Sequence, residues 1–475
     1  MARASRCLAV AALAVAGCTV GPDFRAPDPP AVDRYVPGAA PSGPGMPRLA
    51  SDRDIPAEWW AVLGSPEIDA LVRRALANSP TLDEARARLV QAQELRTART
   101  GVAQLPQFDA AFGAERQRID PATFGFPQAP NPGPFNVFTL GVSVSYNFDL
   151  FGGTRRELEA LAADVDYYGF ELEAARLALA GNVVGTAIRQ ASLRAQVEAV
   201  EAILAAQRRQ LSIVEDRYAS GGVAWVDVQS QRSLVAQTDA TLSPLRAQRA
   251  QAGHLLAILV GDAPATADLP VVRLTDLRLP AEIPLRIPSE LVRQRPDIRA
   301  SEALLHKASA NVGVATADLY PKLVISGNVS SSQLNIGDVL GNGLNIWNIA
   351  ANLVQPIFRA DELQARKRAA EAAYSQALAG YRQSVLLGLL NVADALRALE
   401  EDGRALAARG EQAARADDAY RIALARYNAG GVSQVAVLDA DRQRLQAEIE
   451  RVQASAARFA DAAALFQAMG GGWGK

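Results

Sequence analysis

The side chains best suited to catalysis or metal binding are scarce and dispersed in this 475-residue sequence. It has two cysteines, Cys7 and Cys18, and two histidines, His254 and His306, each histidine alone in a helical stretch. Such a set provides neither a disulfide framework nor a zinc-type cluster. A phosphate loop, a Ser-His-Asp order and a nucleotide fingerprint are also missing from the sequence. We therefore expect neither an enzyme nor a cofactor, and the net charge of −2 gives no basic footprint for nucleic acid.

Cys18 is the exception, because its position predicts covalent modification. Residues 1–17 combine a positively charged start, a short apolar run and small residues, as a secretory signal peptide does. Residues 15–18, Val-Ala-Gly-Cys, resemble a bacterial lipobox, whose cysteine is acylated and becomes the mature N-terminus. Acyl chains would hold it at a membrane, since each buried CH₂ contributes about 0.8 kcal/mol. Thr19 directly follows the cysteine, and by the usual sorting pattern of bacterial lipoproteins the absence of Asp at that position favours the outer membrane. The alternative is an ordinary signal peptide with a chance cysteine.

Two turn sequences share one pattern and differ in where their acidic side chains stand. Residues 217–223 and 426–432 both read Arg-Tyr-x-x-Gly-Gly-Val, and each lies between long polar helical stretches. Asp227 follows the first turn and has no acidic counterpart after the second. Asp439 follows the second turn and has no acidic counterpart after the first. We infer that the architecture is duplicated and that these differences carry function.

Other landmarks repeat in the same order. Residues 78–92 (NSPTLDEARARLVQA) resemble residues 294–308 (QRPDIRASEALLHKA). Each half then reads helix, strand, strand, very long helix, turn and long helix, which predicts an internal duplication. The predicted organisation is a signal peptide at 1–17, an extended leader at 18–60, a first repeat at 61–262, a linker at 263–290, a second repeat at 291–470 and a tail at 471–475.

The predicted strands have one apolar and one polar face. In residues 138–149 (FTLGVSVSYNFD) every even position is apolar and every odd position is small or polar. Successive side chains of a strand point to opposite faces, and alternation also occurs over 106–116, 323–330 and 347–354. A tilted membrane strand needs about 9–11 residues, whereas no stretch beyond the N-terminus approaches a membrane helix. We expect the strands to cross a membrane; the alternative is a half-buried sheet in a soluble domain.

Four strands cannot close a barrel by themselves. Open edges in lipid would leave backbone groups unpaired, so copies of the chain must associate. Two copies would provide eight strands, which leave room only for side chains inside. A conducting channel therefore requires three copies or more.

The long helices are predicted to form the wall of a duct. Residues 361–427 contain no proline and would extend over roughly 100 Å as a helix. Their apolar and small residues recur in alternating steps of three and four, a spacing typical of left-handed coiled-coil packing. After the turn, residues 434–468 return alongside.

Three kinds of segment resemble the TolC-like outer-membrane factors, specifically the lipoprotein, NodT-type branch that serves drug-efflux pumps. They are residues 18–24 (CTVGPDF), the two Arg-Tyr-x-x-Gly turns and residues 295–323 (RPDIRASEALLHKASANVGVATADLYPKL). The resemblance covers essentially the whole mature chain. It implies a mixed fold in a homotrimer: a transmembrane β-barrel of twelve strands, four from each internally duplicated chain, continued by a long α-helical coiled-coil barrel or tunnel. It also implies an equatorial belt from residues near 27–60, 262–290 and 469–475.

The same resemblance implies a location and partners. The trimer is expected in the bacterial outer membrane, anchored in its lipid and extending into the periplasm. There it would join a periplasmic adaptor (membrane fusion) protein and an inner-membrane efflux pump of the resistance-nodulation-division type, conducting small molecules passively to the exterior. The alternatives are the exit duct of a type I protein secretion system, and a non-conducting periplasmic coiled-coil structural lipoprotein.

The resemblance also assigns roles at the two turns, which it places at the periplasmic tips. Asp439 falls on the family's constricting aspartate, and Val435, one turn earlier, falls on its hydrophobic constriction. Asp227 falls on the residue that ties one hairpin to the next through a tyrosine, here Tyr427. Ala436 stands where the family often has a second acid. The alternative for Asp439 is a solvated charge or a helix cap, and Tyr427 equally fits a coiled-coil seam position.

Overall fold

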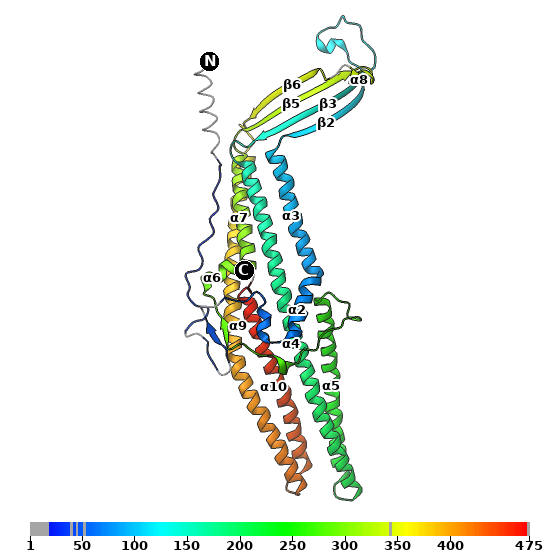
Figure 1. The fold of residues 1–475 in the computed structure, drawn as a ribbon, viewed down its shortest axis with the longest axis vertical. Helices are drawn as coiled ribbons and strands as arrows, with labels where there is room; N and C mark the ends of the chain where they lie inside the picture. The colour runs from blue at the N-terminus through cyan, green and yellow to red at the C-terminus, as the bar shows by residue number, and fades with distance from the viewer. Residues whose placement is uncertain (1–18, 39–40, 44–45, 51–53, 342–343, 473–475) are drawn as a thin grey trace. The chain divides into compact units, whose positions relative to one another are not determined.

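The computed structural model describes residues 19–38, 41–43, 46–50, 54–341 and 344–472 (Figure 1). The predicted signal peptide, 1–17, and Cys18 lie outside these described residues. The chain divides into two compact units, and stretches of both repeats enter each unit. Unit 1 contains the described residues up to Pro27, with Arg88–Tyr168 and Ser301–Tyr381; unit 2 contains Asp28–Ala87, Gly169–Ala300 and the chain from Arg382 onward.

Unit 1 contains a four-stranded antiparallel sheet in the order β2-β3-β5-β6. The prediction of two strands in each repeat is confirmed. Strands β3 and β5 join the repeats, with a register that runs from Phe138 opposite Gln333 to Phe148 opposite Leu323. Strands β2 and β6 form the two edges. The strands are β2 (Gln107–Gln117), β3 (Phe135–Phe148), β5 (Lys322–Gln333) and β6 (Ile346–Val354).

One face of this sheet is apolar and uncovered in the single chain. The register places Phe108 opposite Val144, and Val329 opposite Trp347, so the apolar side chains of all four strands share a face. Phe108 and Trp347 are both 71 % exposed. A half-buried sheet of a soluble domain would cover these side chains with its own core. The exposed apolar face therefore favours the predicted membrane sheet over the soluble alternative.

Helices that belong partly to unit 1 and partly to unit 2 lead into and away from the strands. Helix α3 (Pro80–Gln104) precedes β2, and α7 (Pro296–Ala317) precedes β5. Helix α4 (Gly153–Ala219) follows β3, and its first turn is capped by Asp149, whose carboxylate accepts hydrogen bonds from the amides of Thr154 (3.1 Å) and Arg155 (2.8 Å). Such capping satisfies amides that have no partner within the helix.

Unit 2 is built on two helical hairpins. Helix α4 returns as α5 (Trp225–Leu259), and α9 (Glu362–Asn428) returns as α10 (Gln434–Ala468). The uninterrupted α9 confirms the predicted long helix. A core cluster of Val197, Val200, Leu204 and Leu242 packs against Leu445 and Ile449 of α10, so apolar contacts join the two hairpins.

Shorter elements complete the described fold. Strands β1 and β4 pair in parallel, and Trp59 stacks on Phe466 of α10 with 6.0 Å between ring centroids. None of the helices in the described ranges is both long and apolar enough to cross a membrane. The shorter elements are β1 (Arg48–Ala50), η1 (Trp59–Leu63), α2 (Pro66–Asn78), η2 (Pro121–Phe124), η3 (Leu274–Asp276), β4 (Glu282–Pro284), α6 (Pro288–Gln294) and α8 (Asp338–Gly341).

Candidate functional site

The two Gly-Gly-Val turns of unit 2 have the same backbone construction. Gly221 ends α4 and Gly430 ends α9, with φ angles of +75° and +77°. In both turns the next glycine amide donates back to the carbonyl of the arginine in the pattern, at 2.7 Å to Arg217 and 2.8 Å to Arg426. Only glycine adopts this left-handed conformation without strain. The repeated pattern is thus a helix-ending signal, and differences between the turns lie in the side chains around it.

Asp227 acts first as a helix cap. Its carboxylate accepts a hydrogen bond from the amide of Ala224 at 3.1 Å, at the start of α5. A carboxylate in the first turn also complements the positive end of the helix dipole. Within the chain, the hydroxyl of Tyr427 donates to Gln434 rather than to this carboxylate. The expected tie through the Asp227 carboxylate is therefore not formed between the hairpins of one chain, because the carboxylate caps its own helix; a tie between neighbouring copies stays a prediction.

Gln434 connects the two hairpins near the turns, as does Arg217, which donates to Asn428 at 2.9 Å. The Gln434 side chain accepts from the Tyr427 hydroxyl at 3.2 Å and donates to the backbone carbonyl of Asp227 at 3.2 Å and to Gln231 at 3.4 Å. Gln434 is 4 % exposed, so these contacts are largely screened from water. The guanidinium of Arg217 lies 5.5 Å from the Tyr427 ring centroid. The ring of Tyr427 thus contacts the first hairpin, whereas its hydroxyl binds Gln434 within the second hairpin.

A second polar contact lies deeper between the hairpins. Gln207 of α4 donates to Asp441 of α10 at 2.7 Å, and Asp441 forms an ion pair with Arg444 at 2.7 Å. The Arg444 guanidinium lies 4.0 Å from the ring centroid of Tyr420 on α9. Burial, followed by the charge of Asp441, raises the pKa of Tyr420. Because Asp441 is 3 % exposed, removing the Arg444 charge would leave its carboxylate buried without this ion-pair partner, which is strongly destabilising. Arg444 depends less on the pair, since Asp417 lies 3.8 Å from its guanidinium.

Sequence reasoning missed Gln207, Gln434 and Asp441. The sequence shows each of them only as a polar residue in a helical stretch, and the structure buries all three. The polar character alone could not reveal them, because α4 and α10 contain many exposed polar residues. Their partners lie 234 positions apart in the case of Gln207 and Asp441.

Val435 and Asp439 lie on the opposite, exposed face of α10. Val435 is 58 % exposed, and the Asp439 side chain is 56 % exposed and paired with Arg442 at 3.0 Å. Their spacing of four residues stacks them on one helix face. The structure therefore brings these two predicted residues together on an exposed face in the single chain, whereas Gln434 and Asp441 face the neighbouring hairpin.

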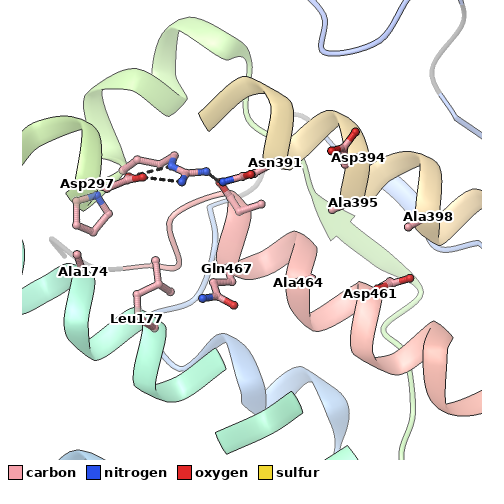
Figure 2. Close-up of a pocket in the computed structure, with 14 residues that line it drawn as sticks. Ala174, Leu177, Asp297, Asn391, Asp394, Ala395, Ala398, Asp461, Ala464 and Gln467 are labelled. Atoms are coloured by element: carbon pink, nitrogen blue, oxygen red, sulfur yellow. Dashed lines mark hydrogen bonds and ion pairs between the residues drawn. The ribbon is translucent and has the colours of Figure 1, made fainter. Parts of the chain in front are cut away.

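A cavity of about 620 Å³ lies elsewhere in unit 2 (Figure 2). Arg295 lines it, donating to the Ala468 carbonyl at 2.7 Å and forming an ion pair with Asp297 at 2.7 Å. Alanines make up much of the remaining wall, and Asp461 of α10 reaches it.

Burial, followed by a hydrogen bond with Asp461, raises the pKa of Asp402 to about 7. In the described ranges, no group of three or more His, Cys, Asp or Glu side chains could hold a metal ion.

Two repeats, each with a strand pair and a long helical hairpin, define the class of duplicated outer-membrane channel subunits. A family model described as outer membrane efflux protein matches the chain twice, over residues 71–262 and 287–471. The chain belongs to the outer membrane efflux protein family.

Known relatives agree with this assignment over most of their length. The chain is 31 % identical to the pyoverdine export outer membrane protein OpmQ of Pseudomonas aeruginosa, with 89 % of each chain covered. It is 27 % identical to the outer membrane protein OprJ of the same species, covering 97 % of this chain and 94 % of the relative. The solved outer-membrane channel OprN is similar with a TM-score of 0.85 and 27 % identity, over 96 % of this chain and all of that one.

The function that follows is that of an outer-membrane channel component of an efflux pump. Its place is the outer membrane, with extension into the periplasm. The family is one of channels.

The contact at Gln434 leads to a prediction for the resting channel. We expect Tyr427→Phe and Gln434→Leu each to raise resting single-channel conductance several-fold. Gln434→Leu removes the hydrogen bonds to Asp227 and Gln231 of the first hairpin, and Tyr427→Phe removes the hydroxyl that holds the Gln434 side chain in place, each hydrogen bond contributing about 0.5–1.5 kcal/mol. The double variant should add little, since both changes break the same contact, whereas Asp227→Ala should add independently to Tyr427→Phe. Coupling of Tyr427→Phe to Asp227→Ala instead would support the tie between neighbouring copies.

A second prediction concerns Asp402. A carboxyl whose pKa is raised in the folded protein is protonated there and ionised in the unfolded chain, so its stabilising effect is lost as pH rises toward 7. The melting temperature should therefore fall between pH 5 and pH 8, by about 1–2 °C for this partly exposed group. Asp402→Asn should remove that part of the decline. Asp394→Asn, on the same helix, is the control, and an identical pH profile in both variants would contradict the assignment.

Proposed function

We propose that three copies of the chain close one passive channel for small molecules. The observation that carries the proposal is the open sheet: β2 and β6 are edges within the chain, and the apolar face that includes Phe108 and Trp347 is exposed. In lipid, unpaired edge groups are very unfavourable. Pairing the β6 edge of one copy with the β2 edge of the next satisfies them, and three copies give a barrel of twelve strands with room for a channel.

Acylation of Cys18 is part of this proposal. The cysteine directly precedes Thr19, the first described residue, and the sequence before it has the character of a lipoprotein signal. Acyl chains would add a lipid anchor to the attachment that the membrane strands provide.

The proposed partners are a periplasmic adaptor and an inner-membrane pump of the resistance-nodulation-division type. Support comes from relatives named as components of export and efflux systems, among them the toluene efflux pump outer membrane protein TtgF of Pseudomonas putida, at 27 % identity over 97 % of this chain. These names favour an efflux channel over the exit duct of a type I secretion system. The exposed apolar sheet face argues against a coiled-coil lipoprotein without a pore.

Val435 and Asp439 are proposed to narrow the channel at its periplasmic end. They occupy the exposed face of α10, opposite the contacts that hold α10 to the first hairpin. Around a threefold axis, three valines would form an apolar ring and three aspartates a charged ring one turn further along. Rings of these two kinds control dewetting and ion selectivity in channels.

Assembly and conduction test the proposed function directly. Purified protein in detergent should have a protein mass of roughly three times the 50.4 kDa chain by light scattering and should give discrete conductance steps in a planar bilayer. A monomer that keeps its strand content by circular dichroism would contradict the shared sheet. A trimer without conductance steps, even after Val435→Ala, would support the structural alternative.

Asp439→Asn tests the charged ring. The change removes three carboxylates and leaves the Arg442 guanidinium groups without their partners, so we expect lower cation preference and weaker block by multivalent cations. Reversal potentials across a salt gradient measure the first effect.

Asp239→Asn is the matched control for this ring. Asp239 is a similarly exposed aspartate on α5, 57 % against 56 %, and is likewise paired with an arginine, Arg208. Equal shifts in reversal potential for the two variants would place Asp439 away from the conduction path.

A further inference from the structure

Within unit 1, residues 19–24 of the leader are held against the helices by a buried arginine. The amide of Val20 donates to the Phe151 carbonyl at 3.0 Å. The guanidinium of Arg156, on α4, then donates to the carbonyls of Val20 (3.2 Å) and Gly21 (3.4 Å) and to the carboxylate of Asp23 (2.7 Å). These contacts join segments about 135 positions apart, so the leader is bound rather than merely adjacent in sequence.

The Arg156 side chain is buried, so it depends on the leader for hydrogen-bond acceptors. The side chain is 6 % exposed, while its partner Asp23 is 90 % exposed. A second partner, Glu159, lies on the same helix at 2.7 Å. A buried guanidinium requires hydrogen-bond acceptors on most of its donors. The leader supplies three of them, so its removal would leave this charge partly unsatisfied.

The backbone of the leader fits the helices only through glycine. A Cβ on Gly21, whose φ is +92°, would lie 2.4 Å from the Cα of Gly313 on α7. A Cβ on Gly313 would in turn lie 2.7 Å from the Cγ of Arg156. Both distances are shorter than real Cβ contacts. The two glycines therefore let the leader backbone approach α7 closely enough for Arg156 to reach its carbonyls.

The end of the bound segment is fixed by an aromatic contact. The ring of Phe24 stacks on His306 of α7, with centroids 4.4 Å apart and planes inclined by 14°. His306 Nε2 lies 2.9 Å from a carboxylate oxygen of Glu159 on α4. Arg156 and Glu159 belong to the first repeat, whereas His306 and Gly313 belong to the second. The site is thus complete only when helices from both repeats are in place.

We propose that Arg156, Glu159, His306 and Gly313 form a docking site for the leader segment Thr19–Phe24. This site attaches the N-terminus to the folded protein independently of acyl chains. It also sets the position of the lipid anchor, because Thr19 lies against Gly152, four residues beyond the end of β3. Docking itself does not require acylation; only the placement of acyl chains rests on the proposed modification of Cys18.

Limited proteolysis of the full-length protein in detergent tests the docking. Trypsin can cut after Arg25, an exposed residue that directly follows the docked segment, and a protease needs several neighbouring residues to be released from the surface. We expect slow cleavage in the wild type. Gly21→Ala and Arg156→Met should each accelerate it about tenfold or more, because each releases the segment. Mass spectrometry of the released peptide measures the rate.

Two matched variants control for unrelated effects. Gly38→Ala also places alanine at a positive φ, +86°, in the leader, but nothing lies within 4 Å of its Cβ. Arg155→Met removes the neighbouring arginine, whose partner is Asp149. Both should cleave at the wild-type rate after Arg25. Because Gly21 belongs to the leader, its variant remains informative even if Arg156→Met fails to fold.

The outcomes separate docking from lipidation. Cleavage after Arg25 that is unchanged by Gly21→Ala, or equally fast in Gly38→Ala, would overturn the docking site. Acceleration by Arg156→Met alone would also overturn it, since that pattern reports a loosened helix pair. The mass of the released N-terminal peptide reports acylation of Cys18 separately, so an unmodified peptide with normal protection would contradict the lipid anchor and leave the docking site standing.

Discussion

The pairing of β3 with β5 is the interaction on which unit 1 depends. It is the only strand pairing in the described sheet that joins the two repeats, since β2 pairs with β3 and β5 pairs with β6 inside their own repeats. Backbone groups of strands are most stable when they are paired, and an open sheet leaves the outer edge of its first and last strands unpaired. Duplication thus produces a sheet that is continuous within the chain and incomplete at its edges. Association with further copies follows from that incompleteness.

In unit 2, side-chain contacts rather than strand pairing hold the two hairpins together. Apolar contacts around Val200 and Leu242 hold the hairpins together along their length. Near the turns, buried polar contacts of Gln434 and Asp441 add to the burial of apolar side chains such as Val228 and Leu438. Because Gln434 and Asp441 are buried, breaking their contacts while the hairpins stay packed would leave polar groups without partners. Opening of the proposed channel end at the turns must therefore disturb these buried contacts.

The leader adds a third kind of connection. Arg156 and Gly313 come from different repeats, and both contact Gly21 or its neighbours. A segment that docks only on the combined surface of α4 and α7 favours the placement of these two helices side by side. Helix α4 follows β3 and α7 precedes β5, so the pairing of these strands requires the same placement. The N-terminal segment and the strand pairing therefore support one another, although one acts through a buried charge and the other through backbone hydrogen bonds.

Local patterns in the sequence determined the elements. Alternation over residues 138–149 predicted β3 to within a few residues, because the period of a strand is a property of neighbouring residues. The two Gly-Gly pairs likewise predicted both turns, because only glycine at Gly221 and Gly430 permits the left-handed ends of α4 and α9. Duplication was visible for the same reason, since each copy repeats the local signals in order.

Tertiary structure decided which side chains meet. Nothing local distinguishes Asp227 as a cap from Asp227 as a tie, and the choice depends on whether Ala224 or Tyr427 comes within reach of its carboxylate. The burial of Asp441 and Arg156 was hidden because residues more than a hundred positions away supply part of their hydrogen bonds. A charged residue in a helix is exposed or buried according to what packs against it, and that is fixed only when distant segments come together.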